Sequence, residues 1–442
     1  MKKLLSLALC LVMLMSMLSG LMVTAAAEDD GVVDAELTAH LRVLYPGTSD
    51  LEKEIAGDIA AEMKKKYPNV EVEFLFLVWS DLESKLAAMI ASGDYPDVMQ
   101  IQDVVNPVSM GALEPVQSWI ENSKTLKMDD FSQVALDNNS VDGTLYAVPM
   151  CMIPYSHIVN TELFANAGID YKAMTSWDDV LNAVKAISTD DVNGFAMANG
   201  GEGRFTFRDF MMIALSNGFT PDDTSEETKA KYIETLTFIE NLAPCMPKSQ
   251  STWLYPELFK AWEAGTVGMM HTGTYFTGNV VSHGVTSMDR TAVCPMPAGP
   301  SAEQPTLMVG TNGYAMIAGS TQKEAAWAFI ETAMSEPILG KLAGSMNVSA
   351  VNYLSDETLI KYASVAYDQY GEDVGEKHIA LMNQFKEAAD QYGIPMPKIL
   401  GQASMEKVVQ GAIIKLTNGE VNAEQAYEEI KEGIDEVKAS LE

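Results

Sequence analysis

The sequence predicts an α/β protein, and three observations lead to that class. Short runs of apolar and β-branched residues alternate with longer segments whose apolar residues recur at helical spacing. The connections between these segments are short. Strand and helix alternating in this way are typical of a parallel sheet covered by helices.

The clearest alternation lies near the start of the chain. Residues 42–45, 70–77 and 97–101 are predicted strands. The two helices between them begin with capping-box sequences, at Ser49 to Glu52 and at Ser80 to Glu83. In parallel sheets, ligands bind beyond the carboxyl ends of the strands. We therefore expect binding residues directly after each of these three strands.

A second unit follows a turn at Asp142–Gly143. Its elements are predicted from apolar periodicity and from capping residues. They are an extended stretch at 146–149, helices at 176–187, 204–214 and 229–242, a strand at 269–273 that ends in a loop, a helix that begins with a capping box at Thr321 to Glu324, and an amphipathic helix at 423–441.

The N-terminus has the form of a secretory signal. Lys2 and Lys3 precede an apolar run over residues 4–23, and Thr24–Ala27 supplies small residues before three acids. We expect cleavage after Ala27 and export to the periplasm or outer cell surface. A retained membrane anchor is the alternative, because the apolar run is long enough to span a bilayer.

Charge and cysteine content exclude several functions. The chain after residue 27 has 27 basic and 61 acidic residues, a formal charge of −34, which disfavours nucleic acid and anionic membrane as partners. Its three cysteines, Cys151, Cys245 and Cys294, have neither zinc-site nor paired spacing. One disulfide among the three remains possible, but the simpler interpretation is that all three are small buried side chains.

No motif for catalysis or cofactor binding is present in the sequence. It lacks a nucleophile elbow, a metalloprotease helix, a P-loop and a dinucleotide fingerprint. The five histidines have no ligand spacing, and Asp190–Gly194 lacks the alternating acids and the closing glutamate of a calcium loop. We expect no catalytic residue, metal or cofactor, although a carboxylate pair for glycoside cleavage would leave no motif.

Several segments, in order, resemble the family-1 extracellular solute-binding proteins, the maltose-binding-like group. The resemblance covers nearly the whole chain after the signal. The segments are Pro96–Val98, Gly111–Pro115, Asp142–Pro149, Val159–Phe164, Ala167–Ile169, Thr175–Asp179, Phe259–Gly265, Met269–Gly273, Pro295–Pro297, Gly310 and Glu324–Ile330.

The resemblance implies a two-lobed periplasmic-binding-protein-like fold (type II) with a ligand cleft between the lobes. Its three crossings divide the chain into lobe one at 28–149 and 297–345 and lobe two at 150–296 and 346–442. It also implies that permease subunits of an ABC-type importer receive the cargo from a monomeric binding protein. The energy would come from those partners, because this chain has no ATP-binding motif.

A sugar ligand requires aromatic rings for its flat faces and planar polar groups for its hydroxyls. The aromatic candidates are Trp79, Tyr155, Trp253, Tyr255 and Tyr275, and the polar candidates are Gln102, Asp103, Arg204 and Asn312. Each has an ordinary alternative role, such as helix packing for Trp79, a helix cap for Asp103 or a surface cation for Arg204.

Departures from the family pattern leave the cargo open. Val159 stands where the family often has an aromatic residue, and Tyr275 stands where it often has a tryptophan that contacts the ligand. The tryptophan that follows the third strand in maltodextrin binders is also absent from this sequence. We expect capture of a mono- or oligosaccharide for import. The alternatives are a secreted carbohydrate-active hydrolase, a binding protein for another solute, and a subunit that presents sugar to a sensor kinase.

Overall fold

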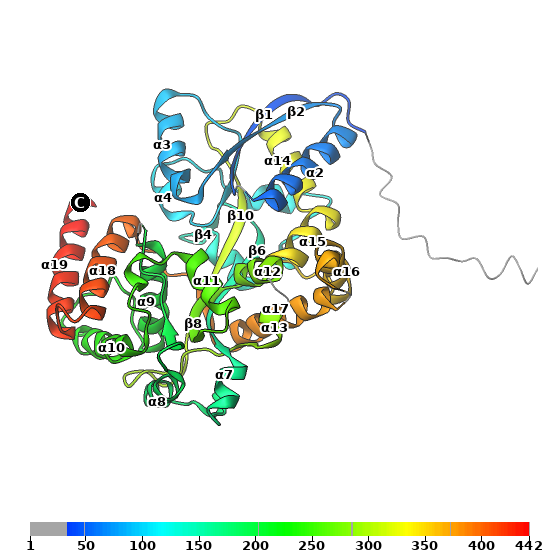
Figure 1. Cartoon of the computed structure of the whole chain (residues 1–442). Helices are drawn as coiled ribbons and strands as arrows, with labels where there is room; N and C mark the ends of the chain where they lie inside the picture. The colour runs from blue at the N-terminus through cyan, green and yellow to red at the C-terminus, as the bar shows by residue number, and fades with distance from the viewer. Residues whose placement is uncertain (1–32, 48, 202, 284–285, 372, 442) are drawn as a thin grey trace, which may run out of the picture.

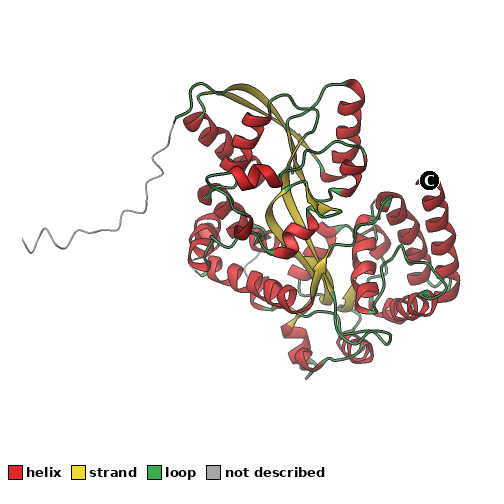
Figure 2. Cartoon of the chain, turned by 180° about the vertical axis from the view of Figure 1, so that it is seen from behind, coloured by secondary structure: helices red, strands yellow, loops and turns green. Residues whose placement is uncertain are grey.

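The computed structural model describes residues 33–441, apart from positions 48, 202, 284–285 and 372. The predicted signal segment, 1–27, lies outside these residues. The described chain forms two lobes, one above the other in Figure 1, and a single sheet runs from one to the other. Figure 2 shows this sheet along the middle of the molecule with helices on both sides. The predicted α/β, two-lobed class is confirmed.

Lobe one is built from the first part of the chain and a later return. Its elements are β1 (Thr38–Pro46), α2 (Asp50–Lys66), β2 (Asn69–Leu77), a 3-10 turn (Trp79–Asp81), α3 (Leu82–Ser92), β3 (Val98–Ile101), α4 (Val105–Ser109), α5 (Gln117–Asn122), a 3-10 turn (Met128–Asp130), α6 (Gln133–Asn138), β4 (Ser140–Val141), β5 (Thr144–Leu145), α14 (Lys323–Ala333) and α15 (Glu336–Ser345).

Lobe two contains the middle of the chain and its C-terminal helices. Its elements are α7 (Thr161–Asn166), a 3-10 turn (Tyr171–Ala173), α8 (Trp177–Ile187), β7 (Asn193–Ala196), α9 (Arg204–Ser216), α10 (Lys229–Leu242), 3-10 turns (Ala243–Cys245 and Gln250–Thr252), α11 (Tyr255–Glu263), β8 (Val267–Gly273), α12 (Tyr275–His283), α13 (Thr286–Asp289), β9 (Thr291–Val293), β11 (Val348–Ser349), α16 (Asp356–Tyr367), a 3-10 turn (Asp368–Tyr370), α17 (Val374–Tyr392), β12 (Gly393–Pro395), α18 (Gln402–Thr417) and α19 (Ala423–Leu441).

Two long strands, β6 (Val148–Asn160) and β10 (Leu307–Met316), pass through both lobes. The main path of the sheet is β2-β1-β3-β10-β6-β8-β7. The first three strands are parallel, as predicted, but β10 is antiparallel to β3 and to β6. The sheet is therefore mixed, because the two strands that join the lobes run in opposite directions.

Each lobe has its own apolar core. In lobe one, α2 and α14 pack on one face of the sheet through Ile55, Ile59 and Phe329, and α3 covers the other face with Leu86. Along β6, Cys151 belongs to the core of lobe one and Met152 to that of lobe two. The change of core along one strand marks a crossing between the lobes.

The predicted helix starts differ in how they are capped. The Ser49–Glu52 box and a box between Ser176 and Asp179 both form. At α14 no box forms, because the N-cap residue, Gln322, hydrogen-bonds instead to the backbone of His40 on β1. At α3 the helix begins later than predicted, since a 3-10 turn (Trp79–Asp81) precedes it and Asp81 is its N-cap.

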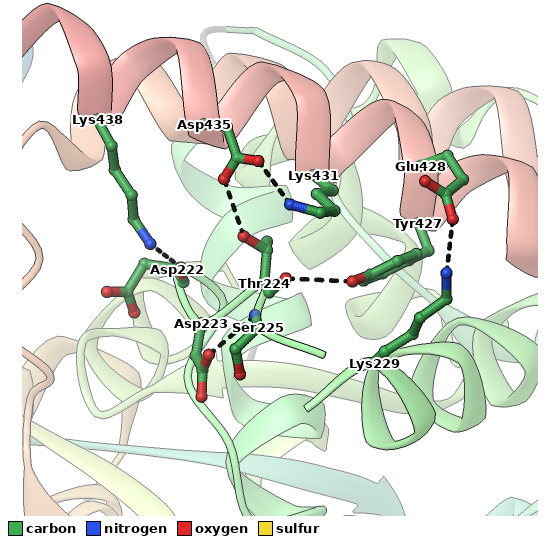
Figure 3. A network of polar contacts seen from close by, with 10 residues as sticks. All are labelled: Asp222, Asp223, Thr224, Ser225, Lys229, Tyr427, Glu428, Lys431, Asp435 and Lys438. Carbon is green, nitrogen blue, oxygen red and sulfur yellow. Dashed lines mark hydrogen bonds and ion pairs between the residues drawn. The ribbon is translucent and has the colours of Figure 1, made fainter. Parts of the chain in front are cut away.

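The C-terminal helix α19 is tied to the loop before α10 by a network that we call the C-terminal strap (Figure 3). The Tyr427 hydroxyl donates to the carbonyl of Thr224 at 3.2 Å. Lys431 pairs with Asp435 at 2.6 Å, and Lys229 pairs with Glu428 at 2.8 Å. The strap consists of Asp222, Asp223, Thr224, Ser225, Lys229, Tyr427, Glu428, Lys431, Asp435 and Lys438.

Two further observations bear on the sequence-based expectations. Cys151, Cys245 and Cys294 are all buried free thiols, so the described chain has no disulfide among them. Within the described residues, none of the helices combines the length and apolar character that a bilayer crossing needs.

Candidate functional site

A pocket of about 540 Å³ lies between the lobes, where α3 and α4 of lobe one face α9 and α18 of lobe two. These helices stand on opposite sides of the interlobe space in Figure 1. The volume of this pocket falls within the range of about 300 to 1,000 Å³ that is usual for ligand pockets. It is lined by Trp79, Asp81, Leu82, Glu83, Met99, Ile101, Gln102, Asp103, Asn106, Pro107, Arg204, Arg208, Met396, Gln402, Ala403, Ser404, Glu406 and Lys407.

The wall from lobe one is formed by residues that follow two parallel strands. Trp79 stands in the turn after β2, and Gln102 and Asp103 follow β3. The carboxyl ends of neighbouring parallel strands meet at one edge of a sheet, so these side chains come together. Asp103 Oδ1 accepts a hydrogen bond from the Val105 backbone N–H at 2.8 Å, so it also caps α4.

The wall from lobe two is formed by the first turns of α9 and α18. Gly203, the N-cap of α9, has a φ of 92°, and a Cβ there would lie 2.6 Å from the carbonyl oxygen of Glu406. Only glycine therefore permits this close approach of the two helices. The approach brings Arg204 and Arg208, one turn apart on α9, beside Gln402 and Glu406 of α18.

One contact joins the two walls directly. The Nη2 groups of Arg204 and Arg208 both donate to Gln102 Oε1, at 2.5 and 2.7 Å. Arg208 is only 7% exposed, and its Nε has no acceptor among the described residues. Two guanidinium groups from lobe two thus share a single neutral oxygen atom from lobe one.

Burial shifts the titration of several groups around the pocket. Burial, together with the neighbouring charge of Arg208, lowers the pKa of the Arg204 guanidinium to about 10. The group stays charged at neutral pH. Burial, with the nearby charge of Asp103, raises the pKa of Glu83. Burial also raises the pKa of Asp103. Low exposure to water is the main cause in all three cases.

Three of the predicted aromatic residues gather behind the arginines rather than in the lining of the pocket. Tyr155 lies under the Arg208 guanidinium at 5.1 Å, and its ring meets that of Tyr275 edge-on at 6.2 Å. Tyr255 lies 5.5 Å from Tyr275 and stacks on Phe205 at 3.9 Å. Tyr255 and Tyr275 are the first residues of α11 and α12, so Tyr275 begins a helix and does not lie in the loop predicted after residue 273.

The other two predicted residues also lie outside the pocket lining. Trp253 is half-buried against the helical core of lobe two. Asn312 is buried on β10, where the pairing of Gly313 with Ile101 brings it to the level of Gln102. The pocket therefore brings together Trp79, Gln102, Asp103 and Arg204 from the predicted set.

Several lining residues had no sequence-based prediction. Arg208 was detectable, because it stands four positions after Arg204 and so faces the same side of the helix. The contribution of α18 was not, since nothing local in residues 402–407 shows that this turn packs beside α9. The unpredicted polar residues of the lining are Asp81, Glu83, Asn106, Arg208, Gln402, Ser404, Glu406 and Lys407.

Residues 48–338 match the family model described as bacterial extracellular solute-binding protein. The chain belongs to this family. The match covers Trp79, Gln102 and the two arginines but ends before α18, so one side of the pocket lies beyond it.

Relatives and solved structures agree with this family. The chain is 24% identical over 372 residues to the diacetylchitobiose binding protein DasA of Streptomyces coelicolor, covering 75% of this chain and 79% of that protein. Its fold is similar to that of a chitin oligosaccharide binding protein, with a TM-score of 0.74 and 18% identity over 91% of this chain and 99% of the other. The sugar-binding protein MalE of Xanthomonas citri gives a TM-score of 0.72 at 20% identity, over 91% and 98%.

The family assigns solute binding to this chain, not catalysis. It also places the chain among exported proteins. The described residues contain no group of three or more histidine, cysteine or acidic side chains arranged to hold a metal ion. The chemistry of the pocket is accordingly that of recognition, through one indole ring, two guanidinium groups, and amide and carboxyl groups.

Proposed function

We propose that this protein captures a carbohydrate between its lobes and delivers it to an ABC-type importer. The observation that carries the proposal is the interlobe pocket, in which Trp79 stands beside polar side chains from both lobes. An indole ring suits the apolar face of a sugar, and planar amide, carboxyl and guanidinium groups suit its hydroxyls. The names of similar proteins, which give diacetylchitobiose, chitin oligosaccharide and sugar as what they bind, support the same ligand class.

Ligand capture in this proposal proceeds by closure of the lobes. The sugar docks on one wall, and the other wall rotates towards it about the strands β6 and β10. We place the second crossing within β10 rather than near residue 297, because Ser301 hydrogen-bonds to Asn217 and Glu234 of lobe two. A ligand favours the closed form only as far as it contacts that form better.

The partners in the proposal are the permease subunits of the importer, which receive cargo from the closed form. We propose that a monomer acts in the periplasm or at the outer cell surface, after removal of residues 1–27. The acidic surface, with a formal charge of −34 from 27 basic and 61 acidic residues, fits a protein that avoids anionic membranes while it diffuses.

A thermal-shift screen of residues 28–442 against saccharides, polyamines and amino acids tests the ligand class. A ligand of the folded state adds about 2.7 kcal/mol of stability at a hundredfold excess over its dissociation constant. We expect a saccharide to raise the melting temperature. A shift with polyamines or amino acids alone would contradict the proposal.

A matched pair of variants then tests the pocket. Trp79→Ala and Trp119→Ala each remove one half-buried tryptophan from lobe one, but only Trp79 lines the pocket. We expect Trp79→Ala to weaken saccharide binding about tenfold, since one stacked ring contributes on the order of 1 kcal/mol. Trp119→Ala should lower stability and leave the dissociation constant unchanged in calorimetric titrations.

A further inference from the structure

The arginine pair of the pocket, Arg204 and Arg208, has no counter-charge in the described part of the chain. Among the described residues, their one hydrogen-bond partner is Gln102 Oε1, a neutral atom. No carboxylate among the described residues lies within ion-pairing distance of either group. Buried charges are normally paired, because removing an ion from water is unfavourable unless an opposite charge compensates.

Several lysines elsewhere in the described chain follow the normal pattern and pair with carboxylates. Lys341 pairs with both Glu54 and Asp58, at 2.8 and 2.6 Å, although it is more exposed to water than Arg208. Lys323 pairs with Glu114 at 2.9 Å. Arg290, outside the pocket, donates instead to the backbone carbonyls of Trp262 and Glu263. The arginine pair differs from these cations because two guanidinium groups share one side-chain amide oxygen.

Acidic side chains do lie around the arginines, but neutral donors occupy them. Glu83 accepts from the Asn106 amide at 3.1 Å. Asp103 accepts from the Val105 backbone N–H at 2.8 Å, and Glu406 accepts from the Gln402 amide at 2.9 Å. The chain thus positions three carboxylates nearby without directing any of them to the arginines.

The support behind the pair keeps it charged and in place. Arg208 rests on the ring of Tyr155 at 5.1 Å, a cation–π contact that stabilises a guanidinium without neutralising it. Gly203 fixes the first turn of α9 against Glu406, which fixes the position of Arg204. The two guanidinium groups are thus positioned in advance for a planar anion, the group that such forks bind in a bidentate manner.

We propose that the cargo is an acidic saccharide whose carboxylate binds between Arg204 and Arg208 in place of the Gln102 amide. This inference rests on the proposed carbohydrate function and names the class of sugar, a uronate-containing mono- or oligosaccharide. Its ring lies towards Trp79, and its hydroxyls lie towards Asp103, Asn106 and Glu406. Binding is non-covalent and requires no cofactor.

Titration calorimetry with matched sugars tests the inference. The probes are digalacturonate and diglucuronate, each compared with the neutral disaccharide of the same linkage, and a sulfated disaccharide. We expect a uronide to bind about 100-fold more tightly than its neutral counterpart, since hydrogen bonds between charged groups are the strong ones. Added salt should weaken uronide binding more than neutral-sugar binding.

Two variants connect the affinity to the arginine pair. Arg208→Gln should reduce uronide affinity about 100-fold and neutral-disaccharide affinity by no more than about tenfold, because the neutral sugar loses a hydroxyl contact but no ion pair. Arg208→Lys should retain part of the uronide affinity. Gln102→Ala is a control that removes the competing amide and keeps both arginines. It removes the group that the carboxylate must displace, so uronide affinity should hold or rise.

The possible outcomes separate this inference from the proposed function. Equal affinity for neutral and acidic sugars, or unchanged uronide binding by Arg208→Gln, would overturn the acidic-sugar inference and leave carbohydrate capture intact. A preference for the sulfated sugar would overturn the assignment of a carboxylate. If no saccharide binds and an amino acid or polyamine does, both proposals fail.

Discussion

The C-terminal strap and the interlobe pocket differ in whether their cationic side chains have carboxylate partners. In the strap, Lys431 and Lys229 each meet a carboxylate within 2.8 Å on the surface of lobe two. In the pocket, Arg204 and Arg208 are less exposed and meet only an amide oxygen. Lys431 and Lys229 are thus paired with carboxylates where a helix is held in place, whereas the two arginines have no such partner among the described residues at the site where we propose that ligand binds.

The largest expected effect comes from removing the buried anchor of the strap. The Tyr427 ring is fully buried against Tyr232 at 5.4 Å. Tyr427→Ala should lower the free energy of unfolding by about 3 to 5 kcal/mol, as a large core ring does. Tyr427→Phe keeps the ring and loses only the bond to Thr224, which contributes about 1 kcal/mol. Urea unfolding measures both. Equal losses in the two variants would mean that the polar network, and not the ring, holds α19.

A buried histidine outside the pocket lining, His378, tests how a buried polar group that is not expected to bind ligand affects stability as the pH changes. Burial lowers the pKa of His378 to about 3, and neither ring nitrogen has a partner among the described residues. The folded state keeps the ring neutral, while the unfolded state takes up a proton below its ordinary pKa of about 6.5. Stability is therefore complete above that pH and falls as the pH drops towards 3.

The variant His378→Phe removes this loss. From the difference between the two pKa values, it should gain about 2 kcal/mol over the wild type at pH 5 and nothing from this source at pH 8. Melting temperatures recorded from pH 8 to pH 4 measure the difference. Parallel curves for the two proteins would contradict the expectation.

The smallest effect concerns the pocket itself. Replacing an unpaired buried cation by an apolar side chain of similar length should stabilise the empty protein, so we expect Arg208→Met to raise the free energy of unfolding by about 1 kcal/mol. Arg208→Lys, which keeps the charge, should not. Chemical denaturation without ligand measures the change. Marked destabilisation by Arg208→Met would mean that the contact with Tyr155 and Gln102 is structural.

Local signals in the sequence predicted most of the fold. The bounds of α10 and α19 agree with the predicted helices because apolar spacing defines both. The strand β10 was not predicted from the sequence, and a strand pattern alone would not say which neighbour it pairs with or in which direction. The missing cap at α14 has the same origin, because its Gln322 is held by a strand far away in the sequence.

The site residues likewise fall into those that local sequence signals predict and those that depend on contacts between distant segments. Trp79, Gln102 and Asp103 follow strand ends, so their place is set by topology that the sequence reveals. Tyr275 follows the end of β8 and Tyr155 lies within β6, but their depth depends on how α11 and α9 pack, and they lie behind the arginines. The α18 wall depends on the contact between Gly203 and Glu406, which are 203 positions apart and share no local signal. Whether each residue binds ligand remains a prediction for the variants above.

In the transport cycle that we propose, the Gln102 amide affects the timing of capture and release. Its Oε1 accepts from both arginines, so a carboxylate that binds between them competes with a group already held there. Such an internal competitor weakens capture by the strength of its own contact. It also speeds unloading, because its return to the arginines replaces the departing anion and the empty receptor leaves the importer ready for another cycle.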